Sequence, residues 1–149
     1  YSSSRNYGIA YNWKIKFNET GKIPAFCNVV PELNHNEMTG LDPAPSASSG
    51  GAGLRVHAAM KLSRHFSFIF LRDRADHPRI AKRMRILEKL YRDRELPVHA
   101  VALKGKNIFH KIFSSLVLAD WTAFYTAQFY GLEVEQVPMV EEFKKLMTR

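Results

Sequence analysis

The chain has 149 residues, of which 46% are hydrophobic and 24% are charged, a composition typical of one soluble globular domain. No apolar run approaches the about 20 residues that span a bilayer, and no signal peptide opens the chain, so we expect no membrane partner. The single cysteine, Cys27, excludes an internal disulfide and favours a reducing, cytoplasmic setting. The chain begins at Tyr1 without a methionine, which suggests a fragment or a processed product.

The first predicted element is a helix over residues 5–18, where apolar residues recur at helical spacing. Ser2 to Ser4 would cap its start, and Gly21 would stop it. Glu19 then lies at or just past the last turn, where the helix carbonyls disfavour a negative charge. This carboxylate is therefore either an ordinary exposed side chain, or held by another group, or a base.

Residues 23–30 are apolar and predict a short strand or a buried helical turn. Residues 31–38 predict a short helix that starts with proline. Glu32 and His35 lie three residues apart on it, hence on one face. His35 is either structural or an acid/base group, because the neighbouring amides and Glu32 are able to fix its tautomer.

The middle of the chain alternates strands and helices. The composition of residues 41–54, rich in Pro, Ser and Gly, predicts a flexible loop, and residues 54–62 predict a short helix. Residues 66–71 predict a strand covered on both faces. Residues 97–103 predict a second strand. Because strand, helix, strand and helix follow one another, we expect an α/β fold with a parallel sheet, and a further strand upstream of Tyr1.

A basic amphipathic helix is predicted between the two strands, with Asp76 as its candidate N-cap. Its outward face carries seven basic residues: Arg79, Lys82, Arg83, Arg85, Lys89, Arg92 and Arg94. A net charge of +8 raises the question of nucleic-acid binding. No aromatic interleaving and no zinc pattern accompany this charge, so a solvated helix face is the favoured interpretation and we expect no nucleic-acid partner.

Two helices end the chain. Residues 107–131 predict a long, mostly apolar helix interrupted by Asp120. Residues 138–147 predict a final amphipathic helix with Val140, Phe143 and Met147 turned inward.

Common catalytic motifs are missing from the sequence, which has no phosphate-binding glycine loop, no dinucleotide fingerprint and no nucleophile elbow. The six histidines show no metal-ligand spacing. We therefore predict neither a metal nor a cofactor, and acid/base chemistry carried by side chains.

A long pattern identifies a family. The segment W-K-x-x-x-N-E-x-x-K-x-P-A-F from Trp13, followed by P-E-L-N-H-N-E from Pro31, resembles the C-terminal half of the bifunctional phosphoglucose/phosphomannose isomerases. These are enzymes of the sugar-isomerase (SIS) fold from archaea and some bacteria. The similarity extends over nearly the whole chain outside the Pro/Ser/Gly loop, through Asp120-Trp121-Thr122 to the C-terminal helix.

The resemblance implies one SIS subdomain over residues 1–149, a three-layer α/β parallel-sheet fold that lacks its first strand. The implied reaction is metal-free isomerisation of glucose 6-phosphate or mannose 6-phosphate to fructose 6-phosphate, a step of glycolysis and gluconeogenesis. The family's catalytic base falls on Glu19, its ring-opening histidine on His35 and its active-site lysine on Lys144, with Lys145 one residue away. No cofactor is implied.

The resemblance also implies partners. The Ser/Thr-rich loop that binds sugar phosphate belongs to an N-terminal SIS subdomain of the same enzyme, and no such loop occurs here. The enzymes are homodimers in which the histidine comes from the neighbouring chain. We therefore expect no appreciable activity from residues 1–149 alone. A non-catalytic module that binds sugar phosphate as a regulator is the alternative, since fold does not fix function.

Overall fold

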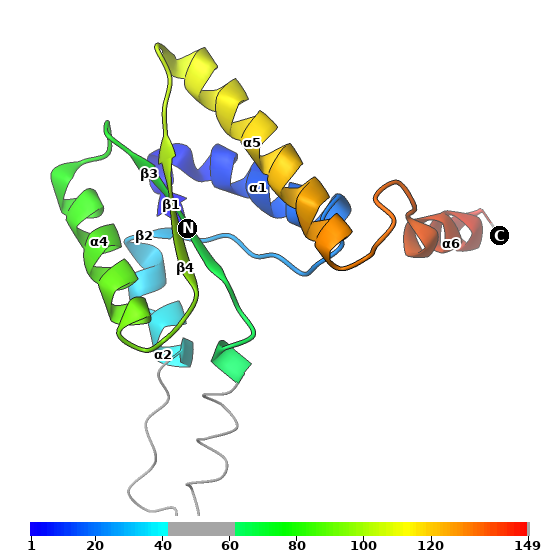
Figure 1. Cartoon of the computed structure of the whole chain (residues 1–149), viewed down its shortest axis with the longest axis horizontal. Coiled ribbons are helices and arrows are strands. Elements are labelled where there is room, and N and C mark those ends of the chain that lie inside the picture. The colour runs from blue at the N-terminus through cyan, green and yellow to red at the C-terminus, as the bar shows by residue number, and fades with distance from the viewer. Residues whose placement is uncertain (42–61, 149) are drawn as a thin grey trace, which may run out of the picture. The chain divides into compact units, whose positions relative to one another are not determined.

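The computed structural model describes residues 1–41 and 62–148, so the predicted loop and the helix over 54–62 lie almost wholly outside the described residues (Figure 1). The chain divides into two compact units. Unit 1 holds Tyr1–Ala10 and Asn28–Lys104, and unit 2 holds Tyr11–Cys27 and Gly105–Arg149. Each unit is described by itself below.

The sheet of unit 1 is parallel, as predicted. Strand β3 (Phe68–Asp73) pairs with β4 (Val98–Leu103), and β1 (Ser2–Ser3) pairs with β2 (Val29–Val30). Two bonds of Tyr1 connect these pairs, because its nitrogen donates to Ile69 O at 2.7 Å and its oxygen accepts from Leu71 N at 2.8 Å. Tyr1 thus bonds to two residues of β3 that lie two positions apart, which is the hydrogen-bond pattern of parallel strands.

The start of the chain differs from the prediction. Residues 1–3 are hydrogen-bonded as a short strand that reaches both β2 and β3, whereas we expected a helix cap there and a further strand only upstream of Tyr1. A 3₁₀ turn, η1 (Ser4–Asn6), follows, and α1 (Tyr7–Glu19) begins two residues later than predicted. Backbone pairing with β2 and β3 therefore overrides the local capping tendency of the serines.

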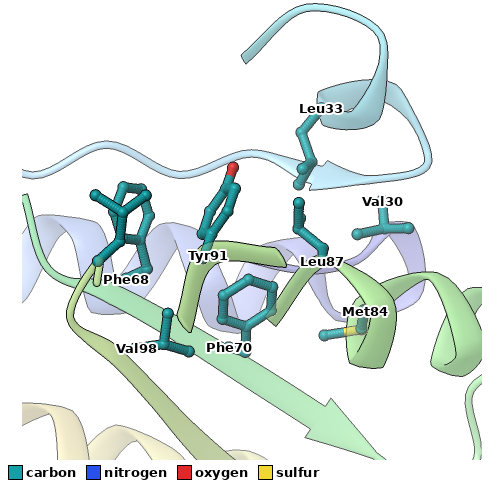
Figure 2. Packing of buried hydrophobic residues seen from close by; sticks show 9 residues of the cluster. Val30, Leu33, Phe68, Phe70, Met84, Leu87, Tyr91 and Val98 are labelled. Atoms are coloured by element: carbon teal, nitrogen blue, oxygen red, sulfur yellow. The ribbon is translucent and has the colours of Figure 1, made fainter. Parts of the chain in front are cut away.

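Helix α4 (Pro78–Arg92) covers the sheet and forms the core of unit 1 with it (Figure 2). Its inner positions recur at helical spacing and meet the alternate side chains of β3. Phe70 is fully buried at the centre of this cluster. The cluster comprises Val30, Leu33, Phe68, Phe70, Met84, Leu87, Tyr91, Leu96 and Val98. Full burial of one such side chain contributes about 1.5–3 kcal/mol.

The outer face of α4 confirms the amphipathic prediction, since six of the seven basic residues named above lie on this helix and all seven are exposed. Its N-cap differs from the prediction. His77 is the cap, with Nδ1 accepting from Arg79 N at 3.2 Å. Asp76 instead turns inward, where it accepts hydrogen bonds from Ser3 and from Asn6. The Asp76 carboxylate thus accepts hydrogen bonds from buried donors near the start of the chain. The His77 imidazole caps the helix in its place.

The segment after β2 also differs from the prediction of one helix over residues 31–38. It forms a 3₁₀ turn, η2 (Glu32–Asn34), and then a short helix, α2 (Glu37–Leu41). The peptide bond between Val30 and Pro31 is cis. Asn36 lies directly before the second helix, where its backbone oxygen accepts from Thr39 N at 3.2 Å and its side chain accepts from Glu37 N at 2.6 Å.

Unit 2 is built on the later part of α1, on α5 (Ile108–Phe129) and on α6 (Pro138–Met147). The ranges of both later helices confirm their predictions. Asn107 caps α5 by accepting from His110 N at 2.8 Å. Trp13 of α1 donates its indole N–H to Ser115 Oγ of α5 at 2.9 Å in a buried contact.

Helix α5 is apolar on two opposite faces. Its buried stripe repeats every fourth residue and is mostly small: Lys111, Ser115, Ala119, Ala123 and Ala127. A second stripe with the same spacing is exposed: Phe109, Phe113, Val117, Trp121, Tyr125 and Phe129. All side chains of α6 are exposed as well, so the prediction that Val140, Phe143 and Met147 turn inward is wrong for the described residues.

Over residues 1–41 and 62–148, none of the helices combines the length and the apolar character that crossing a membrane requires.

Replacing Phe70 by alanine should lower the free energy of unfolding by about 3–5 kcal/mol, because it opens a cavity in the core of unit 1. Urea titration followed by far-ultraviolet circular dichroism measures the change. Phe66→Ala is the matched control, since Phe66 is 41% exposed, and should cost far less. Equal losses in the two variants would contradict this description of the core.

Candidate functional site

The three predicted site residues are distributed over the two units. Glu19 is the last residue of α1, and Lys144 lies on α6, so both belong to unit 2. His35 follows η2 in unit 1. All three side chains are exposed, as groups that meet a substrate must be.

The end of α1 is closed tightly around Glu19. Thr20 N and Gly21 N both donate to Lys16 O, at 2.9 and 3.0 Å, and Ile23 N donates to Phe17 O at 3.2 Å. These bonds satisfy carbonyls that the helix end would otherwise leave free. Glu19 is thereby held at a defined position at the carbonyl end of the helix.

The turn requires glycine at position 21. A Cβ atom added to Gly21 would lie 2.8 Å from Phe17 O, and Gly21 is buried. Lys22 follows with a φ of 56°, in the left-handed region. The turn is therefore compact, and its backbone conformation is closely defined.

A side chain beside Glu19 locks the same turn. Asn18 Oδ1 accepts from Ala25 N at 2.7 Å and so connects the last turn of α1 to the segment that leaves it. Lys22 Nζ donates to Gln136 O at 2.7 Å, which connects the turn to the segment before α6. Neither contact was predicted from the sequence. Asn18 and Lys22 are both fixed positions of the quoted pattern, which was the signal available for these two contacts.

The carboxylate of Glu19 forms no hydrogen bond or ion pair within residues 1–41 and 62–148. Lys16, one turn earlier, is paired with Asp120 of α5 instead, with Nζ 2.7 Å from Oδ1. The side chains of this pair are 30% and 49% exposed, so its contribution to stability is roughly 0.2–1 kcal/mol. From the sequence, Asp120 was expected only as an interruption of an apolar helix, and no partner was predicted for it.

On α6, Lys144 Nζ donates to Glu141 Oε1 at 2.7 Å, an exposed pair three residues apart. Lys145 makes no ion pair with any part of the chain that the structure describes. The two lysines therefore have different surroundings on α6.

His35 lies in a polar turn. Its backbone N–H donates to Glu32 O at 2.9 Å, which closes η2. The side chains expected to orient its imidazole bind elsewhere, since Asn36 Nδ2 donates to Glu32 Oε1 at 3.3 Å and Asn34 Nδ2 donates to Met38 Sδ at 3.3 Å. Within the described ranges the imidazole has no hydrogen-bond partner.

A buried pair of tyrosines anchors the segment that carries His35. Burial, and next the hydrogen bond with Glu37 of α2, raise the pKa of Tyr1 well above its ordinary value. Burial also raises the pKa of Tyr91 to about 12. Both phenols therefore stay protonated near neutral pH, and Glu37 accepts a further bond from Asn28 Nδ2 at 2.6 Å. These contacts connect α2 to the sheet and so place the turn before it.

A cavity of about 390 Å³ lies in unit 1 beside the start of α4, away from the three predicted residues in the sequence. Its walls are Ser3, Ser4, Arg5, Val30, Ala75, Asp76, His77 and Ile80. Its polar side chains are largely paired with one another or with backbone, for example Arg5 with Ala75 O at 3.0 Å. None of the predicted site residues lines it.

The parallel pairing of the strands and the helices beside them agree with the α/β fold expected of a SIS-type subdomain. Residues 1–147 match the family described as the bacterial phospho-glucose isomerase C-terminal SIS domain. The chain belongs to this family.

The names of curated relatives agree with this family. Bifunctional phosphoglucose/phosphomannose isomerases from Thermoplasma volcanium and Aquifex aeolicus are 28% and 29% identical to this chain, each over 97% of it. One from Caldicellulosiruptor bescii is 30% identical over 91% of it. The chain spans only 41%, 40% and 36% of these proteins, so it corresponds to a part of them.

Gly21→Ala should destabilise unit 2 by about 1–3 kcal/mol, since the new methyl group has to displace the backbone at Phe17. Both tryptophans lie in unit 2, so urea titration followed by tryptophan fluorescence reports on it. Gly8→Ala, near the other end of α1, is the control, because a Cβ there meets nothing within 4 Å. It should leave stability unchanged or raise it. A Gly21→Ala variant as stable as Gly8→Ala would contradict the tight turn.

Proposed function

We propose that this chain is the C-terminal part of an enzyme that interconverts glucose 6-phosphate or mannose 6-phosphate with fructose 6-phosphate. The membership of the family and the names of the relatives support this proposal. The structural observation that carries it is the position of Glu19, an exposed carboxylate without a partner in the described part of the chain, held by a tight helix end.

The first step in the proposed mechanism opens the sugar ring. One group takes the proton from O1 while another protonates O5, and the bond between C1 and O5 breaks. We assign these proton transfers to His35 and Lys144. An imidazole suits the task because its ordinary pKa lies close to neutral pH, so it both donates and accepts protons.

The second step moves hydrogen between carbons. Glu19 takes the proton from C2 while O1 gains a proton, which gives an enediol. Glu19 then returns the proton to C1 as O2 loses its own, and the product is the ketose. A carboxylate suits this step because it is ionised at neutral pH and removal from water increases its basicity.

Further parts of the enzyme belong to the proposal. Anchoring the remote phosphate supplies orientation for the reaction, and we assign this to an N-terminal SIS subdomain. The exposed apolar stripe of α5 is the surface that such a subdomain or a second chain would cover, since large exposed apolar patches mark interaction sites. We also propose a homodimer in which His35 serves the neighbouring chain's site.

Glu19→Gln, made in the protein that carries this chain, should lower turnover by about 10²–10⁴-fold, because a positioned base contributes that much. Binding of the sugar phosphate, measured by calorimetry, should persist. Turnover within about threefold of the unaltered protein would exclude Glu19 as the base. Binding without any turnover in the unaltered protein would instead support a regulatory module.

Lys144→Met and Lys145→Met form a matched pair on α6. If Lys144 moves the ring-opening proton, its replacement should lower turnover of the cyclic sugar about 10²-fold, and the neighbouring replacement should have little effect. Steady-state kinetics of both variants decides this. A large loss in Lys145→Met alone would move the assignment by one residue.

A further inference from the structure

Two lysines flank Glu19 at equal distances along the chain, Lys16 three residues before it and Lys22 three residues after it. Residues three apart on a helix lie on the same face, so Lys16 is within reach of a carboxylate on Glu19. An ammonium beside a carboxylate stabilises its charged form and makes it a weaker base. A base in this position works best when both lysines are held elsewhere.

The structure holds both of them elsewhere. Lys16 Nζ lies 2.7 Å from Asp120 Oδ1 on α5, and Lys22 Nζ donates to Gln136 O at 2.7 Å. Glu19 itself pairs with neither of them, nor with any other described residue. Each neighbouring cation therefore has an acceptor other than the proposed base.

The contact of Lys16 is set by the packing of the two helices. Trp13, one turn before Lys16, donates to Ser115 Oγ at 2.9 Å in a buried hydrogen bond. Ser115 and Asp120 are five residues apart on α5, so the hydrogen bond and the ion pair fix α1 along α5 at two points. This register brings Lys16 beside Asp120 of α5.

We propose that Asp120 is a positioning residue that binds Lys16 and so keeps the Glu19 carboxylate free of a cation. This rests on the proposed function of Glu19 as the base. Asp120 touches no reacting atom in this scheme. It acts through Lys16, so replacing Lys16 by an uncharged residue should leave turnover nearly unchanged.

The test compares two ways of breaking one ion pair in the protein that carries this chain. Asp120→Ala frees Lys16 to pair with Glu19, and we expect kcat to fall roughly three- to tenfold with KM changed by less than about twofold. Lys16→Met breaks the same pair but removes the cation, and should leave kcat within about twofold of the unaltered protein. In the double variant kcat should return to the level of Lys16→Met.

A merely structural ion pair gives another pattern. Equal losses in both single variants, or a double variant as slow as Asp120→Ala, would overturn the proposal. If circular dichroism shows that Asp120→Ala is unfolded, Asp120→Asn replaces it, because it removes the charge at almost constant size. Failure of the proposed function is separate, since it appears as turnover in Glu19→Gln whatever the Asp120 variants do.

Discussion

The fixing of α1 against α5 is the constraint on which the candidate site depends. It uses one neutral and one charged contact, from Trp13 to Ser115 and from Lys16 to Asp120. The buried stripe of α5 that includes Ser115 is otherwise built mainly from alanine, and small side chains allow close approach of neighbouring elements. The end of α1, and with it Glu19, then has little freedom to shift along α5.

Elements with strong periodicity could be predicted from the sequence. Helices α5 and α6 and both main strands occur within two residues of the predicted ranges, because their apolar patterns are long or uniform. The ends of elements were less predictable. Asp76 has the right chemistry for an N-cap, but buried donors from Ser3 and Asn6 bind it in the folded chain. Such donors lie about 70 residues away, and no local pattern reveals them.

The candidate site, too, could be predicted only in part. The choice of Glu19, His35 and Lys144 came from a family pattern and remains a proposal, since single side chains of these types are common on protein surfaces. The polar contacts around Glu19 could not be predicted. Lys16 and Asp120 are 104 positions apart in the chain, and only the packing of two helices brings them together. The orientation expected for His35 depended on amides that bind other groups.

The two tryptophans are distinct optical probes, because Trp13 of α1 contacts the buried stripe of α5 and Trp121 lies on its exposed stripe. Trp13 is 5% exposed and bonded to the buried stripe, whereas Trp121 is 54% exposed on the outer stripe. Iodide or acrylamide in the solvent therefore has ready access to one indole and hardly any to the other. Emission from Trp121 shifts to the blue when the outer stripe is covered, and emission from Trp13 shifts to the red when the helices separate. One spectrum thus distinguishes association from unfolding.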